Sequence, residues 1–410
     1  MKTDCPQRQI ALDGRFKRQV VATCLLMLSS LSHAGEYALG GGFLGTAALE
    51  ASAVRADNYF YQSSNTVSAN GYRVRPSLST SRTASGSRFT ATSYLEQADF
   101  DLRGRLDRYL DYGVDTGLSI RPFTRHSFDL SADFRRGHDP AGLQRTEQGQ
   151  PDFSRGEIDL WNQGSGSFSY RYGSPESLGS NTLRALLIDR RYTTNRASTA
   201  FLDYRVTELG YELAYEYSPK TAFTVNMAHR ATDYGRATLP SFGNRNGNEF
   251  SVRGGIRWAA TAKTSGDIQL GVREYWVDGR GRPARQALSW RANIAWTATP
   301  STELKLNTGR TTNETFRADT LFIDDRSVGL SWQQTWTTRL NTRLSANFNR
   351  SEFVPSNRKD NLIAAAAGFD FLLSRRTKLF GEYLSRNRDS SSPTLDYDAP
   401  EARLGFRWSL

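Results

Sequence analysis

The feature that most constrains this chain is a hydrophobic period of two residues. Between Leu288 and Trp296, alternate positions carry apolar or aromatic side chains, and the positions between them are largely polar. Successive side chains of a β-strand point to opposite faces, so the pattern predicts a strand with one apolar and one polar face. The same alternation recurs in residues 112–120, 128–135 and 250–258. Helical spacing is nowhere sustained, and we expect an all-β fold.

The joints between these segments alternate in length. Short joints rich in proline or small polar residues, which favour tight turns, are residues 121–124, 217–221, 299–302 and 374–377. Longer polar joints are residues 137–156, 233–247, 279–285 and 386–395. Short turns at one end and long loops at the other are typical of bacterial outer-membrane barrels.

Counting the segments predicts a closed antiparallel transmembrane β-barrel of eighteen strands over residues 48–410. Sixteen strands is the alternative, because the alternation slips or blurs in residues 181–192 and 362–371. A soluble sandwich or propeller would also show alternation. Aromatic side chains near the strand ends favour the barrel, since such residues form girdles at membrane interfaces.

The composition fits a barrel better than a helical membrane protein. Only 38% of residues are hydrophobic, yet 12% are aromatic and glycines number 34. In a barrel only every second strand residue touches lipid, so a polar average is compatible with a membrane protein. After residue 34 we find no apolar run of the ~18 residues that a membrane helix needs.

The first 34 residues have the parts of a cleavable signal peptide. Basic residues up to Arg18 precede an apolar stretch over 20–31, and Ser32-His33-Ala34 forms a small-x-small site before Gly35. The apolar stretch is too short for a membrane anchor. We therefore predict a signal peptide over 1–34, a short periplasmic segment over 35–47, and the Gram-negative outer membrane as the location.

Cysteine content and charge restrict the chemistry further. Cys5 and Cys24 both lie within the predicted signal, so we expect no disulfide framework and no thiolate metal site in the mature chain. The net charge is +11 at pH 7. A basic balance can indicate nucleic acid, but an exported chain meets none, so we expect no nucleic-acid partner. We expect the basic residues to meet anionic solutes or lipopolysaccharide instead.

The final segment is typical of the closing strand of an outer-membrane protein. Leu404, Phe406, Trp408 and Leu410 alternate with polar or small residues up to the end of the sequence. These four residues are the predicted sorting signal, and the partner they imply is the β-barrel assembly machinery. An aromatic final residue is the usual pattern, and Leu410 departs from it.

Charged residues on the polar parity are the candidate pore lining. Charged linings set the selectivity of many pores, although they also simply solvate a barrel interior. The basic candidates, mostly in the second half of the chain, are Arg73, Arg75, Arg253, Arg257, Arg273, Arg291, Lys305, Arg343, Arg403 and Arg407. The acidic candidates, in the first half, are Asp111, Asp115, Asp129, Asp133, Glu212 and Glu216. Facing walls of opposite charge would favour anions.

The sequence contains no recognisable catalytic constellation. His126, His138 and His229 stand outside any nucleophile motif and form no metal-spaced pair. We therefore expect no catalytic residues, no metal site, no cofactor and no enzymatic activity.

Two segments near the start of the predicted barrel carry a family resemblance. Val54-Arg55-Ala56-Asp57-Asn58-Tyr59-Phe60 and Val74-Arg75-Pro76-Ser77-Leu78 resemble the opening of the outer-membrane β-barrel porins of exopolysaccharide biosynthesis operons. The turn Tyr217-Ser218-Pro219-Lys220-Thr221 is similar to that family as well. The resemblance extends loosely over residues 45–410 and implies an outer-membrane step in polysaccharide secretion. It also implies a polysaccharide substrate and periplasmic or inner-membrane export proteins as partners.

Several functions remain open at this point. The first is a conduit that secretes an exopolysaccharide, and the second is a porin for small anionic or sugar solutes. A barrel enzyme acting on lipid or lipopolysaccharide is an alternative of another class, which a nucleophile and base at the outer rim would identify. A scaffold for an extracellular assembly is a fourth.

Overall fold

The computed structural model describes residues 37–102, 108–147, 158–174, 177–236, 238–239, 243–259, 263–278 and 284–409. Within these ranges, β-strands make up most of the chain. The strands are β1 (Tyr37–Gly40), β2 (Phe43–Ala56), β3 (Ala69–Ala84), β4 (Ser87–Phe100), β5 (Arg108–Phe123), β6 (His126–Asp139), β7 (Asp159–Tyr172), β8 (Gly179–Tyr192), β9 (Tyr204–Ser218), β10 (Thr221–Tyr234), β11 (Thr238–Leu239), β12 (Gly243–Asn244), β13 (Gly247–Trp258), β14 (Thr264–Val277), β15 (Arg285–Thr299), β16 (Thr302–Asn313), β17 (Phe322–Thr335), β18 (Leu340–Val354), β19 (Lys359–Leu372), β20 (Thr377–Ser390) and β21 (Tyr397–Ser409).

Helical structure is confined to short loop segments. They are α2 (Arg196–Thr199) and 3-10 turns at Gln144–Thr146, Ala200–Leu202 and Pro393–Leu395. No helix in the described ranges is long and apolar enough to cross a membrane.

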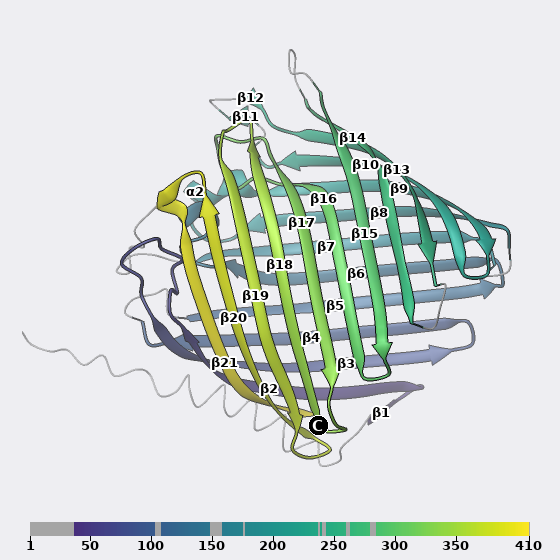
Figure 1. Ribbon diagram of the computed structural model, residues 1–410, viewed down its shortest axis with the longest axis horizontal. Coiled ribbons are helices and arrows are strands. Elements are labelled where there is room, and N and C mark those ends of the chain that lie inside the picture. Colours follow the sequence, from purple (N-terminus) through teal and green to yellow (C-terminus); the bar gives the residue numbers. More distant parts are fainter. Residues whose placement is uncertain are drawn as a thin grey trace, which may run out of the picture.

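The long strands close into a barrel (Figure 1). Each pairs antiparallel with its neighbours along the chain, and β21 returns to β2 in a register that runs from Ala48↔Ser409 to Ala56↔Glu401. The barrel has eighteen strands, β2–β10 and β13–β21, which confirms the predicted fold class and the larger strand count. β8 and β19, where the sequence alternation blurs, are ordinary members of the sheet. β1 pairs only with β2, and β2 already pairs with β3 at Leu44, before residue 48.

The two ends of the barrel differ, as the alternating joint lengths predict. One end carries short turns, such as the two residues between β3 and β4, and the last strand ends there (Figure 1). At that turn Gly86 has φ +71°, and a Cβ on it would lie 2.8 Å from the Arg121 carbonyl oxygen, so glycine suits the position. The other end carries the long connections, and we call it the long-loop rim.

The register fixes which residues share a face. Residues directly opposite each other in adjacent strands point to the same side. The pairings therefore place one set of alternate residues from every strand inside the barrel and the other set outside it. Large exposed apolar side chains such as Leu270, Val272, Leu288 and Val328 occupy the outward parity. They form a belt below the long-loop rim, with outward arginines such as Arg326 above it. This apolar belt is the surface that a β-barrel presents to lipid.

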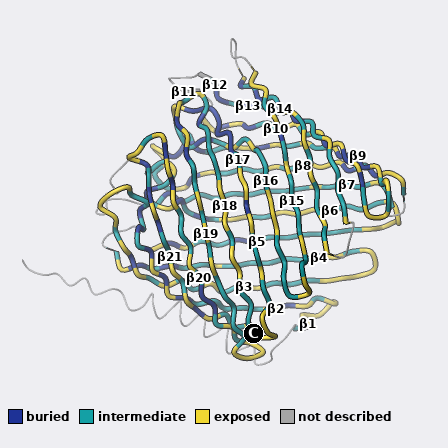
Figure 2. Tube along the Cα trace, viewed as in Figure 1, coloured by how far each residue is buried: buried dark blue, intermediate teal, exposed yellow. Residues whose placement is uncertain are grey.

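The buried residues gather at the long-loop rim rather than at mid-barrel. Val54, Phe100 and Tyr109 form one cluster there, and Tyr275 and Phe322 belong to a second on the opposite side of the rim. Along the strands, exposure alternates from residue to residue (Figure 2). Loops that fold over and into this end therefore supply its two hydrophobic clusters.

Candidate functional site

All sixteen charged residues predicted to line the barrel lie on the inward parity. The structure joins many of them into ion pairs instead of leaving two walls of opposite charge. At the closing edge, Arg403 and Arg407 contact Glu50, at 3.6 and 2.6 Å. On the neighbouring strands Arg73 makes a bidentate pair with Glu401 at 3.0 Å, and Arg75 lies 3.7 Å from Glu96.

A second network joins predicted acidic and basic residues directly. Arg257 of β13 contacts Glu212 at 3.1 Å and Glu216 at 3.3 Å, both on β9, so these pairs reach across the inward face of β10. Arg343 pairs with Asp370, and Lys305 pairs with Glu303 at 2.8 Å. These local pairs neutralise much of the basic lining that the sequence suggested.

The acidic residues of β5 and β6 are also partly paired. Asp115 accepts a 2.8 Å contact from Arg135, which also lies 3.7 Å from Asp133. Asp111 contacts His138 at 2.9 Å, and Asp129 accepts a hydrogen bond from Ser119. The sequence analysis missed Arg135 as the counter-ion of this wall.

Two predicted basic residues differ from the rest. Within the described part of the chain, Arg253 and Arg291 have no carboxylate within salt-bridge distance, and Arg253 donates only to the Ser289 hydroxyl, at 3.1 Å. Arg273, by contrast, is buried beneath β16 and β17, where it contacts Glu249 and Asp324. Of the ten predicted basic residues, the two without a carboxylate partner thus lie on β13 and β15.

The loop that follows β6 reaches across the long-loop rim. Glu147, whose side chain is 2% exposed, contacts Arg317 at 3.2 Å, Arg358, and Arg388 at 3.3 Å. Those arginines belong to the β16–β17 loop, the β18–β19 loop and β20, so one carboxylate ties the loop to the far wall. We call Glu147, Arg317, Arg358 and Arg388 the rim clamp.

Hydrogen bonding keeps the rim clamp charged. Burial would lower the pKa of the Arg358 guanidinium, but hydrogen bonds to Asp360 and Glu147 outweigh burial and raise it. The Arg317 guanidinium donates to Asp319 and lowers the pKa of that carboxyl. These contacts therefore favour the charged forms of Arg358 and Asp319.

A glycine lets the same loop dock on the β2–β3 loop. Gly142 has φ +90°, and a Cβ on it would lie 1.7 Å from the Phe60 carbonyl oxygen. Phe60 itself is fully buried. The loop is therefore held on the β2 side by backbone contact and on the far side by the rim clamp, and it narrows the mouth.

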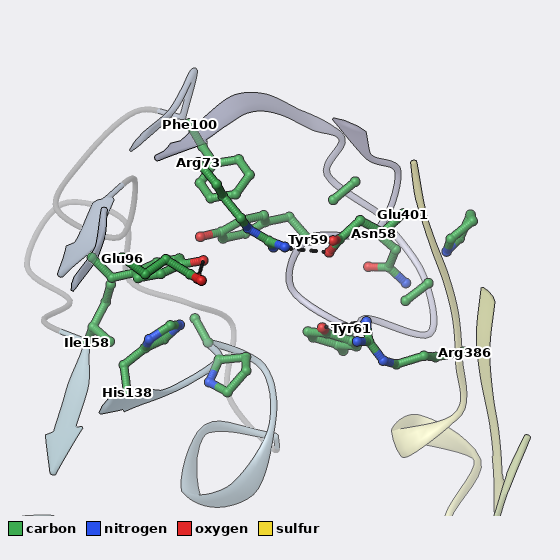
Figure 3. A pocket seen from close by; sticks show the side chains of 16 residues that line it. Asn58, Tyr59, Tyr61, Arg73, Glu96, Phe100, His138, Ile158, Arg386 and Glu401 are labelled. Carbon is green, nitrogen blue, oxygen red and sulfur yellow. Dashed lines mark hydrogen bonds and ion pairs between the residues drawn. The ribbon is translucent and has the colours of Figure 1, made fainter. Parts of the chain in front are cut away.

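Beneath this loop lies a cavity of about 230 Å³, lined from β2–β6 and from the closing strands (Figure 3). Its aromatic lining includes Tyr59, Tyr61 and Tyr109, and the Tyr109 ring stacks on His138 with centroids 4.0 Å apart. The Arg73–Glu401 pair and Arg386 supply charged hydrogen-bonding groups. We call this the rim cavity.

The tyrosines of the rim cavity stay neutral. Burial raises the pKa of the Tyr61 phenol, which accepts a weak 3.5 Å contact from Arg386. Its hydroxyl therefore remains a donor. Ring faces beside guanidinium, carboxylate and hydroxyl groups make a surface suited to a neutral or weakly anionic polyhydroxylated ligand.

The histidines and acidic groups form no metal site among the described residues. His126 contacts the Tyr170 hydroxyl at 2.9 Å, His138 pairs with Asp111, and His229 lies 6.0 Å from the Trp276 ring. Each histidine thus has an ordinary packing partner.

The predicted sorting residues occupy the outward face of β21. Leu404 and Phe406 are exposed, and the Phe406 ring stacks on Trp408. Leu410 lies outside the described residues. The predicted signal peptide over 1–34 also lies outside them, so recognition by export and assembly factors stays a prediction.

No pattern in the sequence points to the rim clamp. Glu147 is separated from its three arginines by 170 to 241 positions. A lone acidic residue in a polar loop resembles any solvated loop charge, and only loop folding brings the partners together.

A closed barrel with an apolar outside, a charged interior and long loops at one end defines an outer-membrane β-barrel of porin-like fold. The family described as "Putative beta-barrel porin 2" matches residues 188–410, and the chain belongs to that family. No functionally curated protein matches the sequence.

Solved outer-membrane barrels are similar in fold. A BenF-like porin from Pseudomonas fluorescens Pf-5 has 10% identity and a TM-score of 0.48, covering 90% of this chain and 99% of that one. OccAB4 of Acinetobacter baumannii has 10% identity and a TM-score of 0.46, covering 92% and 99%. The siderophore receptor PirA of Acinetobacter baumannii has 9% identity and a TM-score of 0.46, covering 89% and 80%.

Proposed function

We propose that this barrel is an outer-membrane conduit through which an exopolysaccharide leaves a Gram-negative cell. The rim cavity carries the proposal, because it places tyrosine rings and hydrogen-bonding charged groups at the mouth (Figure 3). A sugar polymer offers hydroxyls to such groups and apolar ring faces to aromatic side chains. Membership of a barrel porin family supports a transport role.

The ion-paired interior suits passage of a long polymer. Arginines that already hold carboxylates, such as Arg257 and Arg343, can exchange contacts with a ligand without leaving an unpaired charge. Conduction requires sites that bind weakly enough to release. In this proposal the loop after β6 restricts the mouth at rest, and the polymer or an export partner displaces it.

A second candidate is a porin for small anionic solutes. The observation that favours it is the pair Arg253 and Arg291, which are left without carboxylate partners in the described interior. In such a porin the loop after β6 would stay in place, because no polymer has to displace it. In both candidates the protein moves its substrate without covalent chemistry, and in the first it works with periplasmic and inner-membrane export proteins.

The two candidates are separated by deleting the gene in its host and measuring polymer on the cell surface and in the periplasm. A conduit predicts that surface polymer falls and periplasmic polymer accumulates, with recovery on complementation. Complementation by Tyr61→Ala with Arg73→Gln should recover less, while the exposed outward control Tyr383→Ala should recover fully. Unchanged surface polymer in the deletion strain, with solute uptake reduced, would favour the small-solute porin.

A further inference from the structure

The wall of the barrel is open between β15 and β16 at its long-loop end. Their ladder runs from Thr299↔Thr302 up to Arg291↔Gly309 and stops there. Above that point β15 continues through residues 285–290 and pairs only with β14. The unpaired Leu288 carbonyl accepts a 3.2 Å hydrogen bond from Arg310, so a side chain takes the place of the missing strand partner.

β16 separates because its upper end turns into the barrel. Thr312 accepts a 2.6 Å hydrogen bond from Arg273 and contacts Glu249, both on the inward faces of β13 and β14. Phe322 of β17 follows the same path and lies 4.0 Å from the Tyr275 ring. Several contacts therefore hold the two strand ends away from β15.

A cavity of about 410 Å³ passes through this opening. Its lining combines inward residues, among them Arg253 and Arg291, with Trp290, Thr308 and Arg310 of the outward parity. Trp290 donates to the Thr308 hydroxyl at 3.1 Å, which bridges the lower edge. The cavity thus connects the barrel interior with the outer surface.

Exposed apolar side chains flank the opening on the outside. Leu288 and its partner Val272 lie on one side, and Val328 lies on the other, with exposed fractions of 51%, 63% and 46%. Two residues beyond Val328 toward the long-loop rim, Arg310, Arg326 and Arg350 stand directly opposite one another on three neighbouring strands, with Arg310 paired to Asp324 and the other two to Glu352. An apolar belt capped by basic residues marks the level where lipid headgroups meet acyl chains.

The charge inside the cavity is unbalanced. Arg230 is paired with Glu208 and Glu314, and Arg310 is paired with Asp324. Arg253 and Arg291 have no such partner among the described residues, and the buried Nε of Arg253 has no hydrogen-bond acceptor. By register, Arg253 stands level with Ser289, two residues from Arg291, so the two guanidinium groups share one region. Adjacent like charges are unfavourable unless an anion lies between them.

We propose that this opening is a binding site for a phosphate-bearing lipid of the surrounding leaflet. The acyl chains lie along the outward apolar residues Leu270, Leu306 and Leu330, which extend from the opening away from the long-loop rim, and the phosphate enters the wall to contact Arg253 and Arg291. Guanidinium groups bind phosphate with paired, charge-assisted hydrogen bonds. The site lies apart from the rim cavity and gives the barrel lateral access to lipid.

Native mass spectrometry of the purified barrel tests the site, with dilauroyl phosphatidic acid as the anionic probe and dilauroyl phosphatidylcholine as the zwitterionic one. The wild type should retain phosphatidic acid preferentially. The double variant Arg253→Gln with Arg291→Gln should lose about tenfold or more of that affinity, as expected for lost charge-assisted contacts. The matched control Arg257→Gln with Arg343→Gln removes two inward arginines elsewhere and should retain it. Heat-dependent gel mobility verifies that each barrel is folded.

Two further arms locate the contact. Inorganic phosphate should compete poorly, because it lacks the chains that lie on the apolar residues. A photoactivatable phosphatidic acid should label peptides of β15 and β16 in the wild type and label them less in the double variant. Equal retention of the two lipids, an unaffected double variant, or labelling spread evenly around the belt would each overturn the proposal.

Discussion

At the scale of single residues, the Glu147 carboxylate joins the loop after β6 to three other segments of the chain. It is buried among three arginines that come from three separate segments. A buried carboxylate is stabilised only when its partners are present, and removing one partner of such a network costs about 3–5 kcal/mol. The position of the loop across the mouth therefore depends on one ionised side chain.

We predict that Glu147→Gln releases this loop and opens the mouth. The variant leaves Arg317, Arg358 and Arg388 without their shared anion. Removing one partner of a buried ion pair costs about 3–5 kcal/mol, which destabilises the docked position of the loop. Single-channel conductance in planar bilayers should rise, with fewer closed intervals. The control Glu303→Gln alters a more exposed pair near the short-turn end and should leave conductance unchanged. A Glu147→Gln channel indistinguishable from wild type would show that the clamp does not restrict the mouth.

The histidines give a negative prediction at the same scale. Replacing His126 or His229 singly with alanine should leave polymer export and conductance within about twofold of wild type, because neither lines the rim cavity and changes of this kind are usually small. His138→Ala removes a ring contact and should lower thermal stability most of the three. Export abolished by His126→Ala or His229→Ala in a folded barrel would reopen the enzyme alternative.

At the scale of elements, the loop after β6 is held by shape as well as by charge. Gly142 approaches the Phe60 carbonyl so closely that any side chain would collide with it. The opposite end of the loop depends on the rim clamp. Two different kinds of contact therefore hold one element, and each can be removed separately.

We predict that Gly142→Ala undocks the loop without changing any charge. The left-handed backbone alone costs a non-glycine residue about 1–2 kcal/mol, and the collision with Phe60 adds to it. Conductance should rise as in Glu147→Gln, and trypsin should cleave the loop faster. Gly164→Ala is the matched control, because a Cβ there meets no atom within 4 Å. Unaltered proteolysis in Gly142→Ala would contradict the docking.

At the scale of the whole molecule, ion pairing reduces the field that the sequence suggested. Arg73, Arg257, Arg343, Arg403 and Arg407 each hold a carboxylate. Among the predicted basic residues, Arg253 and Arg291 keep no carboxylate partner in the described interior, and both lie on one side of it. A selective barrel with this arrangement would be weakly anion-preferring, with β13 and β15 contributing to the selectivity.

We predict a modest anion preference that salt weakens. Reversal potentials at low salt should favour anions, and the preference should fall as the Debye length shortens to about 8–10 Å at physiological ionic strength. Arg253→Gln with Arg291→Gln should reduce it. Arg403→Gln should change it less, because its removal leaves Glu50 paired with Arg407. Cation preference in the wild type would refute the assignment.

The fold followed from the sequence because the barrel imposes a local rule. Each strand must alternate between lipid and interior, and burying an unpaired charge in lipid costs about 2–4 kcal/mol per arginine or lysine at the bilayer midplane. Whether residues such as Arg291 and Leu288 face inward or outward could therefore be predicted from their own strand, without knowing which strands lie beside it. The eighteen strands, their turns and the inward placement of all sixteen candidate charges follow from that local constraint.

The tertiary structure alone decided which charges meet and where the wall opens. Arg257 and Glu212 face the same interior by parity, but only the order of the strands, with β10 between β9 and β13, brings them into contact. The rim clamp joins residues far apart in sequence, and the gap above Arg291↔Gly309 arises because β16 turns inward to pack on β14. Parity depends on each strand by itself, whereas pairing and packing depend on which distant segments lie together, which the local pattern does not encode.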